Sequence, residues 1–240
     1  DNQQFGSQNT WSGTFTLPVN PDNDVLLTYS ESFRAPTFND LYYPNFSNPD
    51  LAPETAKSYE LQWRSQLSDS ARLETSLYRT DLEDAIIFGS NSRPQNVASA
   101  RINGFEAALS QELFGWQGNL GLAIIDPGDR DSGHTLARRA RRTLSLDLDR
   151  QFDRLSLGAS WQAVSSSYDD ENNHNTLGGY ALLGLRGSWT LNREVKLDLK
   201  VDNLLDKGYS RALYSHEGGQ YGYREEGRAW LFGVTWTPAL

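Results

Sequence analysis

Apolar and polar residues alternate along most of this chain, and such alternation places the two kinds on opposite faces of a β-strand. In residues 195–202, for example, valine and leucine alternate with lysine and aspartate without a break. Helical spacing, by contrast, is hard to find. The pattern predicts about eleven strands, near residues 11–17, 25–34, 58–67, 72–85, 97–112, 117–126, 141–150, 154–167, 180–191, 194–205 and 229–237.

The connections between these strands alternate in length. Short links fall near residues 20–24, 68–71, 113–116, 151–153 and 192–193. Long links, rich in Gly, Pro, Asn and Asp, fall near residues 35–57, 87–96, 127–140, 168–179 and 206–228. Tight turns at one end of a meander and long loops at the other are typical of a transmembrane β-barrel. We therefore predict an all-β fold, an antiparallel up-and-down transmembrane barrel.

A soluble antiparallel sandwich is the alternative, because each strand alone also fits a sheet with one buried face. Three features favour the barrel: the regular alternation of link lengths, the charges along the whole inner face, and aromatic residues near strand ends, where barrels carry interface girdles. These aromatic residues are Trp11, Tyr59, Trp63, Trp161, Trp189, Trp230 and Trp236.

Composition narrows the function classes. The chain has 240 residues, with 31 acidic against 22 basic side chains and a formal charge of -9, which argues against a duplex nucleic-acid binder. It contains no Cys, so disulfides and thiolate metal sites are excluded. The sequence has no apolar run of about eighteen residues, so it predicts no membrane-spanning helix. It also contains no Met and begins at Asp1 with loop composition, so we expect a fragment or a processed product.

Five segments in order carry a family resemblance. Residues 33–36 read Phe-Arg-Ala-Pro, and residues 48–54 read Asn-Pro-Asp-Leu-Ala-Pro-Glu. Residues 100–106 read Ala-Arg-Ile-Asn-Gly-Phe-Glu, residues 136–140 read Leu-Ala-Arg-Arg-Ala, and residues 202–209 read Asp-Asn-Leu-Leu-Asp-Lys-Gly-Tyr. With these motifs at strand ends and around long loops, the chain resembles the TonB-dependent outer-membrane receptors.

The resemblance implies that residues 1–240 form the C-terminal half of a plugged barrel of about 22 strands. On this interpretation the energy-coupling box, the plug domain and the first barrel strands are absent. The family usually ends in an aromatic residue, whereas this chain ends at Leu240, four residues after Trp236. A half-barrel alone has two unpaired edges, which lipid cannot satisfy. We expect it to close into a smaller barrel, to pair with a second copy, or to need its missing half.

The implied function is active uptake of a large, scarce ligand across the outer membrane of a Gram-negative-type cell, with no enzymatic activity and no cofactor. Cobalamin (vitamin B12) is the expected ligand. A siderophore is the alternative within the family, and a passive small porin-like barrel is the alternative outside it. An odd strand count argues against the passive pore. Expected partners are outer-membrane lipid, lipopolysaccharide, and the TonB energy-coupling system through the absent plug, with no nucleic acid.

Aromatic loop residues are the candidate ligand contacts, because flat rings cover a large ligand face at low entropic cost. By resemblance, the first candidates are Tyr42, Tyr43, Asn45 and Phe46 in the first long loop. The second group, in the last loop, comprises Tyr214, Tyr221 and Tyr223, together with His216. The alternative is that these rings only pack their own loops.

Two clusters of carboxylates could hold a hard cation, although neither matches a known calcium-loop spacing, and solvated or lipopolysaccharide-bridging roles are more common. They are Asp126, Asp129 and Asp131 with His134, and Asp169, Asp170 and Glu171 with His174. We predict no dedicated metal site. The arginines at 138, 139, 141 and 142 are expected to pack in the polar lumen. The sequence contains no catalytic motif of the common hydrolase, metalloprotease or phosphate-loop types.

Overall fold

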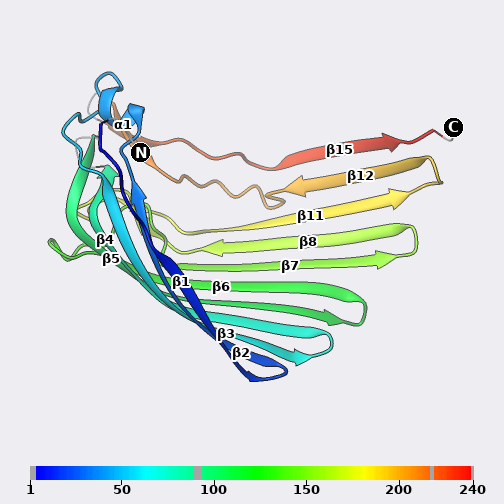
Figure 1. Cartoon of the computed structure of the whole chain (residues 1–240). Helices are drawn as coiled ribbons and strands as arrows, with labels where there is room; N and C mark the ends of the chain where they lie inside the picture. Colours follow the sequence, from blue (N-terminus) through cyan, green and yellow to red (C-terminus); the bar gives the residue numbers. More distant parts are fainter. Residues whose placement is uncertain (1–3, 89–92, 217–218, 239–240) are drawn as a thin grey trace.

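A computed structural model describes residues 4–88, 93–216 and 219–238 of the chain. Eleven strands form one antiparallel sheet in the order β1-β2-β3-β4-β5-β6-β7-β8-β11-β12-β15, so nearly every strand pairs with the next along the chain (Figure 1). Their bounds are β1 Ser12–Asn20, β2 Asn23–Arg34, β3 Glu54–Ser68, β4 Ala71–Phe88, β5 Pro94–Leu113, β6 Trp116–Asp129, β7 Arg142–Phe152, β8 Leu155–Val164, β11 Tyr180–Thr190, β12 Val195–Asp202 and β15 Ala229–Trp236. The predicted all-β antiparallel meander is confirmed.

The alternating sequence gives the sheet one apolar face. Strand register aligns Leu27, Leu61, Leu77, Phe105 and Ile124 across five neighbouring strands. The side chains of the two leucines at the centre of this row, Leu61 and Leu77, are exposed. A sheet with a continuous exposed apolar face is the arrangement of a barrel wall that meets lipid, and we call this the outer face.

The opposite, inner face is polar and holds ion pairs between neighbouring strands. On it, Arg186 of β11 reaches over Gly158 of β8 to Asp149 of β7, with Nη2 to Oδ2 at 2.5 Å. A Cβ at position 158 would lie within 2.5 Å of the Arg186 side chain, so the glycine makes room for this ion pair. Gly104 likewise lies beneath the ring of Tyr78. Small residues on this face therefore accommodate the large polar ones.

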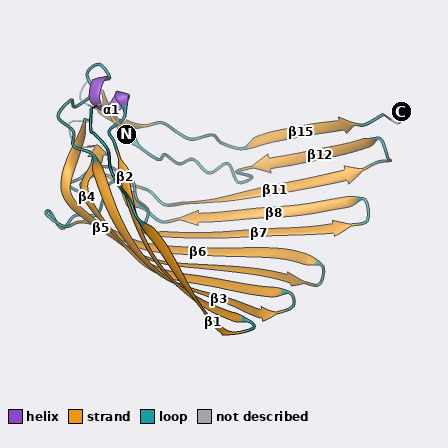
Figure 2. Cartoon of the chain, viewed as in Figure 1, coloured by secondary structure: helices purple, strands orange, loops and turns teal. Residues whose placement is uncertain are grey.

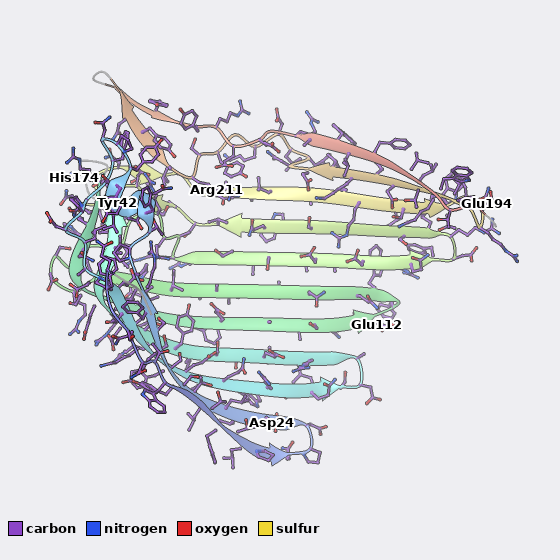
Figure 3. All side chains as sticks on the ribbon, turned by 45° about the horizontal axis from the view of Figure 1, so that its top comes forward. Asp24, Tyr42, Glu112, His174, Glu194 and Arg211 are labelled. Atoms are coloured by element: carbon purple, nitrogen blue, oxygen red, sulfur yellow. The ribbon has the colours of Figure 1, made fainter. Side chains whose placement is uncertain are left out.

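The links alternate in length as predicted, and this separates the two ends of the sheet. Short turns join β1 to β2, β3 to β4, β5 to β6, β7 to β8 and β11 to β12 at one end, where Asp24, Glu112 and Glu194 lie (Figure 3). Long loops emerge at the other end, where Tyr42 and His174 lie. The tight turn between β5 and β6 has positive φ at both of its central residues, 114 and 115.

Small elements occupy the long loops (Figure 2). They are the five-residue helix α1 Phe38–Tyr42 and the strands β9 Ser167–Tyr168, β10 Thr176–Leu177, β13 Leu213–His216 and β14 Gly219–Gly222, which pair as β9 with β10 and β13 with β14. Elements this short carry too few residues for a periodic sequence pattern. Within the described residues, no helix is long and apolar enough to cross a membrane.

The sheet is open, with β1 and β15 at its two edges, so of the three outcomes expected for a half-barrel, closure into a smaller barrel is not what the structure shows. Several strand boundaries also differ from the sequence prediction, and the start of β3 differs the most. Strand β3 starts at Glu54, four residues early, so Tyr59 and Trp63 lie inside the strand instead of near its end. Tyr59 still pairs with Tyr29, and the two rings lie 5.2 Å apart.

The prediction that the arginine run packs in the polar lumen is wrong for Arg138 and Arg141, whose ion-pair partners lie elsewhere. Strand β7 begins only at Arg142, so strand alternation does not govern the three arginines before it. Arg141 pairs with Asp126, Nη2 to Oδ1 at 2.8 Å, and Asp126 shares the outer face with Ile124. Arg138 pairs with Asp169 in the following long loop. Carboxylates therefore hold Arg141 at the outer face and Arg138 among the loops.

Candidate ligand-binding loops

The first long loop, between β2 and β3, presents its aromatic residues on and after helix α1. Thr37 starts the helix with a capping box, since its hydroxyl accepts from the Asp40 backbone N–H at 3.2 Å and the Asp40 carboxylate accepts from the Thr37 backbone N–H at 2.8 Å. Leu41 faces inward and is 3% exposed, whereas Tyr42, Tyr43 and Phe46 are 48%, 53% and 53% exposed. The helix therefore buries its leucine and turns the aromatic side chains outward.

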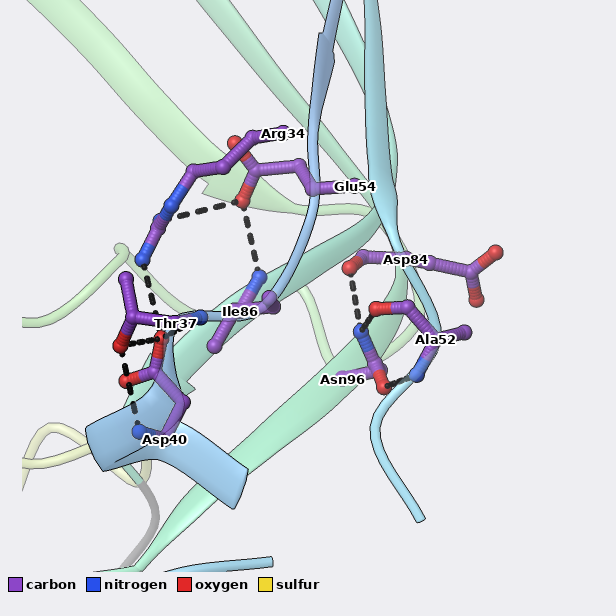
Figure 4. Close-up of polar contacts among 8 residues, drawn as sticks. All are labelled: Arg34, Thr37, Asp40, Ala52, Glu54, Asp84, Ile86 and Asn96. Carbon is purple, nitrogen blue, oxygen red and sulfur yellow. Dashed lines mark hydrogen bonds and ion pairs between the residues drawn. The ribbon is translucent and has the colours of Figure 1, made fainter. Parts of the chain in front are cut away.

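Two charged side chains fasten this loop to the sheet (Figure 4). The Arg34 guanidinium lies 3.6 Å from Asp40 and 3.8 Å from Glu54, so it joins α1 to the start of β3. Glu54 in turn accepts from the backbone N–H of Ile86 in β4 at 2.9 Å. Arg34 and Glu54 belong to the Phe-Arg-Ala-Pro and Pro-Glu motifs, whose chemistry here is structural anchoring.

Asn96 of β5 fixes the second half of the same loop. Its Oδ1 accepts from the Ala52 N–H at 2.9 Å, and its Nδ2 donates to the carbonyls of Ala52 at 3.0 Å and Asp84 at 2.6 Å (Figure 4). Asp84 has φ 55°, and the β4–β5 ladder is interrupted at this residue while its register stays the same on both sides. Asn48 adds a bond to the Pro94 carbonyl at 3.2 Å. The loop is thus held from β3, β4 and β5.

The last long loop presents its tyrosines on the β13–β14 hairpin. Tyr214 and Tyr221 are paired across the two strands, and Tyr223 follows directly after β14. The three ring centroids lie 5.0 to 6.1 Å apart. A hydrogen bond with Tyr223 raises the pKa of the Tyr221 hydroxyl. The side chain of His216 lies outside the described part of the structure.

Both predicted groups lie at the long-loop end of the sheet, but they do not merge into one cluster. Phe38 packs with Tyr42 at 5.1 Å and Tyr43 with Phe46 at 6.4 Å. In the part of the chain that the structure describes, no ring contact joins these residues to the hairpin tyrosines. Asn45 has φ 69° and turns the chain between Tyr43 and Phe46. The aromatic residues that the sequence singled out therefore form two surfaces on separate supports.

A residue that the sequence suggested as a possible metal ligand instead joins three loops. Asp169 Oδ1 accepts from Arg138 Nε and from the Leu213 backbone N–H, both at 2.9 Å. Asn173 in the same loop makes two bonds of 2.8 Å to the backbone of Thr135. The loops after β6, β8 and β12 are thereby connected. Sequence spacing carries no signal for such contacts, because they link residues more than thirty positions apart.

The other loop carboxylates are also satisfied by protein groups. Asp129 accepts from the Ser132 hydroxyl at 2.6 Å and from the Asp131 N–H at 2.9 Å. Burial tends to raise the pKa of Asp170, but backbone donors at Asn175, His174 and Asn172 outweigh it and hold this pKa below its usual value. Over residues 4–88, 93–216 and 219–238, no group of three or more His, Asp or Glu gathers as a metal site.

A polar hollow that the sequence did not predict lies beneath the last loop, on the inner face. It measures about 450 Å³, and its lining includes Asp147, Gln162, Asp202, Tyr209 and Glu226. The loop above it is held at its start by Asn203, which is 7% exposed and exchanges two bonds of 2.9 Å with the backbone of Lys207. The Asp-Asn-Leu-Leu-Asp motif thus holds in place the start of the loop that covers this hollow.

An antiparallel meander with an apolar outer face, a polar inner face and long loops at one end defines part of a transmembrane barrel wall. The family model described as "TonB dependent receptor-like, beta-barrel" matches residues 1–204. The chain belongs to this family, as its motifs indicated.

The chain is also similar to two individual transporters. The vitamin B12 transporter BtuB of Vibrio vulnificus is 32% identical over 241 residues, which cover 98% of this chain and 38% of that protein. The vitamin B12 transporter BtuB of Photobacterium profundum is 26% identical over 220 residues, covering 87% of this chain and 36% of its own length. The chain therefore spans well under half of these relatives.

Among solved structures, the ferric-catecholate import receptor Fiu from K12 E. coli shares the fold, with a TM-score of 0.74 and 20% identity. That match covers 95% of this chain and 34% of Fiu. The copper transporter OprC matches with a TM-score of 0.77 at 20% identity, over 93% of this chain and 38% of its own. At this identity the matches establish the fold and nothing about the ligand.

Proposed function

We propose that this chain forms the C-terminal part of an outer-membrane receptor barrel that takes up cobalamin. The observation that carries the proposal is its 32% identity to a vitamin B12 transporter over nearly its whole length, against 20% to Fiu and OprC. In this function no bond is made or broken. The chain supplies a barrel wall and ligand-contacting loops, and energy coupling would come through segments outside it.

The two aromatic surfaces are the proposed ligand contacts. Tyr42, Tyr43 and Phe46 present flat, half-exposed rings from an anchored loop, and Asn45 adds an amide between them. The hairpin presents three more rings with hydroxyl groups, those of Tyr214, Tyr221 and Tyr223. A corrin ring is broad and amphipathic, so ring stacking with peripheral hydrogen bonds is the chemistry that would hold it. A ferric siderophore with aromatic groups is the second candidate, because the same rings could contact it.

A segment exchange tests this function. The 240-residue chain replaces the matching segment of Vibrio vulnificus BtuB, and uptake of radiolabelled cyanocobalamin is measured in cells that lack their own transporter. We expect saturable, TonB-dependent uptake. The matched control carries the corresponding segment of Fiu, which has the same fold but a different ligand in its name.

The outcomes separate the alternatives. Uptake by the chimera with this chain and not by the Fiu chimera supports a cobalamin receptor. Equal uptake by both chimeras would mean that the segment carries no ligand preference. Uptake of a ferric catecholate instead of cyanocobalamin would move the assignment to siderophores. Surface labelling of each chimera in whole cells shows that the barrel has assembled, so a failure to fold is not mistaken for a change of ligand.

A further inference from the structure

One charged side chain interrupts the apolar outer face near the short turns. Strand register places three successive rows of paired residues across β6, β7, β8, β11, β12 and β15 in this region. The row nearest the turns and the row farthest from them consist of aliphatic and aromatic residues and glycine. The middle row consists of Trp116, Arg150, Leu157, Gly187, Leu199 and Phe232. Arg150 therefore lies on a surface that otherwise suits lipid acyl chains.

Two aromatic rings and a glycine place the guanidinium of Arg150. Its Cζ lies 4.4 Å from the ring centroid of Phe152 and 5.8 Å from that of Trp116, and these two rings meet edge to face at 6.1 Å. A Cβ on Gly115, in the β5–β6 turn, would lie 3.6 Å from Arg150 Nε. The side chain therefore extends from its row toward the turn end of the sheet, where Glu112 lies (Figure 3), as long basic side chains do at a membrane interface.

No counter-charge for Arg150 comes from the residues that the structure describes. None of their carboxylates lies within ion-pair distance of it, and its guanidinium makes no hydrogen bond to them. Asp149, the preceding residue, points to the inner face and pairs with Arg186 at 2.5 Å. A ring contact uses the flat side of a guanidinium and leaves its in-plane N–H groups free to donate. Arg150 thus presents a held, unneutralised donor group to the lipid side of the sheet.

We propose that Arg150 binds the phosphodiester of a glycerophospholipid whose acyl chains lie over Leu148 and Leu146, on the same face of β7. Short turns of such barrels face the periplasm, so the lipid that reaches Arg150 comes from the periplasmic leaflet, which is built of glycerophospholipids. A guanidinium can hold a phosphate through two parallel hydrogen bonds. The site is independent of the ligand that the receptor takes up.

Both parts of such a lipid are needed to match this surface. A free phosphate would gain nothing from the apolar rows beside Arg150. An uncharged lipid would cover those rows but leave the guanidinium without an anion, in surroundings where an unpaired charge is costly. A phosphodiester joined to acyl chains satisfies the charge and the apolar face together.

The test uses the full 240-residue chain refolded in dodecyl maltoside, and native mass spectrometry measures its Kd for dioleoyl-phosphatidylglycerol. We expect Arg150→Gln to weaken binding about tenfold, the loss that follows from removing a charge-assisted hydrogen bond. The matched control is Arg142→Gln, which removes the same charge from the same strand and face, at its loop end. Its Kd should stay within about twofold, because about 27 Å of strand, well beyond the screening length, separates the two arginines. Equal weakening by both variants would mean that net charge alone attracts the lipid.

A second variant tests how the guanidinium is held. Phe152→Leu keeps an apolar side chain and removes the nearer ring, so binding should weaken about threefold. Combined with Arg150→Gln, the same change should add almost nothing, because the ring acts through the guanidinium. An additive loss in the double variant would overturn this positioning role of Phe152.

Three further arms use the unaltered chain, so they can refute the proposal even if a variant does not fold. Dioleoylglycerol, which has the same acyl chains and no phosphate, should bind about tenfold more weakly than dioleoyl-phosphatidylglycerol. Dioleoyl-phosphatidylethanolamine, which keeps the phosphodiester, should bind more tightly than dioleoylglycerol, and millimolar inorganic phosphate should not displace the lipid. Equal binding of dioleoylglycerol and either phospholipid, displacement by inorganic phosphate, or an unaffected Arg150→Gln variant would each overturn the proposal.

Discussion

The two loops that carry the candidate ligand contacts are supported in different ways. The loop between β2 and β3 is tied by side chains to three strands, through Arg34, Glu54 and Asn96, and it buries two leucines, at positions 41 and 51, to 3% exposure each. The β13–β14 hairpin holds itself together mainly by its own ladder. Outside that ladder, the hairpin contacts Asp169, and Asn203 holds the base of its loop.

This difference shows that two loops of similar aromatic composition can form different kinds of binding surface, one held in place and one able to shift. A ring on the anchored loop keeps its position without ligand, so binding there loses little conformational entropy. A ring on the hairpin can shift with the hairpin as a unit, which favours adaptation to the ligand. We therefore expect the anchored loop to dominate affinity and the hairpin to respond more to binding.

The largest effect is expected from Asn96→Ala, which removes all three side-chain bonds at Ala52 and Asp84. At about 1 kcal/mol for each bond, the local opening free energy of the anchored loop should fall by about 3 kcal/mol. Hydrogen exchange of the chain in detergent should show lost protection at residues 48–54 and none at the hairpin. Asn119→Ala, which loses the single bond from the Ser110 hydroxyl, is the matched control. Equal loss in both loops would contradict the separation of the two supports.

Asp169→Ala should act on the β13–β14 hairpin and leave the anchored loop unchanged. It removes the acceptor for Arg138 and for the Leu213 N–H, so the hairpin should lose about 2 kcal/mol of local stability. Hydrogen exchange at residues 211–214 should rise while residues 48–54 keep their protection. Asp153→Ala, in a short turn at the far end, serves as the control. If the anchored loop also loosens, the loops form one cooperative unit and the comparison fails.

The loss of ligand affinity on substitution should show which of the two aromatic surfaces contributes more to binding. In the cobalamin-transporting chimera, Tyr42→Ala with Tyr43→Ala should weaken cyanocobalamin binding about tenfold, because pre-positioned aromatic residues carry most of an interface's free energy. Tyr221→Ala with Tyr223→Ala should weaken it about threefold. Equilibrium binding to whole cells measures both. The reverse ranking would assign the principal contact to the hairpin, and unchanged affinity in both would show that these rings only pack their loops.

The smallest effect is a pH dependence at Asp170, in the loop that holds the hairpin. Its folded-state pKa lies below the usual 3.8, so its backbone bonds add stability that is fully present above that value. The contribution is lost as the pH falls through the lower folded pKa. Cleavage by pepsin in residues 165–179 should therefore stay slow at pH 5 and accelerate below about pH 3.8. In Asp170→Asn the rate should change less between these two pH values, and an identical profile would exclude Asp170 as the cause.

The sheet itself was predictable from the sequence, because strand formation depends on a period of two that each segment carries locally. All eleven predicted segments correspond to strands of the sheet, and the long and short links fall at the expected places. The start of β3 was less predictable, since Glu54 joins the strand by pairing with Arg34 of β2, a residue distant in sequence. Helix α1 spans one turn, too short for a periodic signal, although Thr37 and Asp40 form its capping box.

The arginine run shows why local pattern was insufficient near the loops. The positions of Arg138 and Arg141 depend on Asp169 and Asp126, which come from other loops or strands. The same limit applies to the family motifs. Their order identified the family, but the role of their polar residues as anchors, such as that of Arg34, required the contacts that the fold creates.

By itself, the sequence determined the strands, their two faces, the alternation of turns and loops, and the positions of the aromatic candidates. All of these depend on residues close together in the chain. Only the tertiary structure decided which charges find partners. It joined Asp169 to two other loops, set Arg150 against two aromatic rings on the outer face, and placed the two aromatic surfaces on unlike supports. The reason is physical, because ion pairs and anchors form between side chains that only strand register brings together.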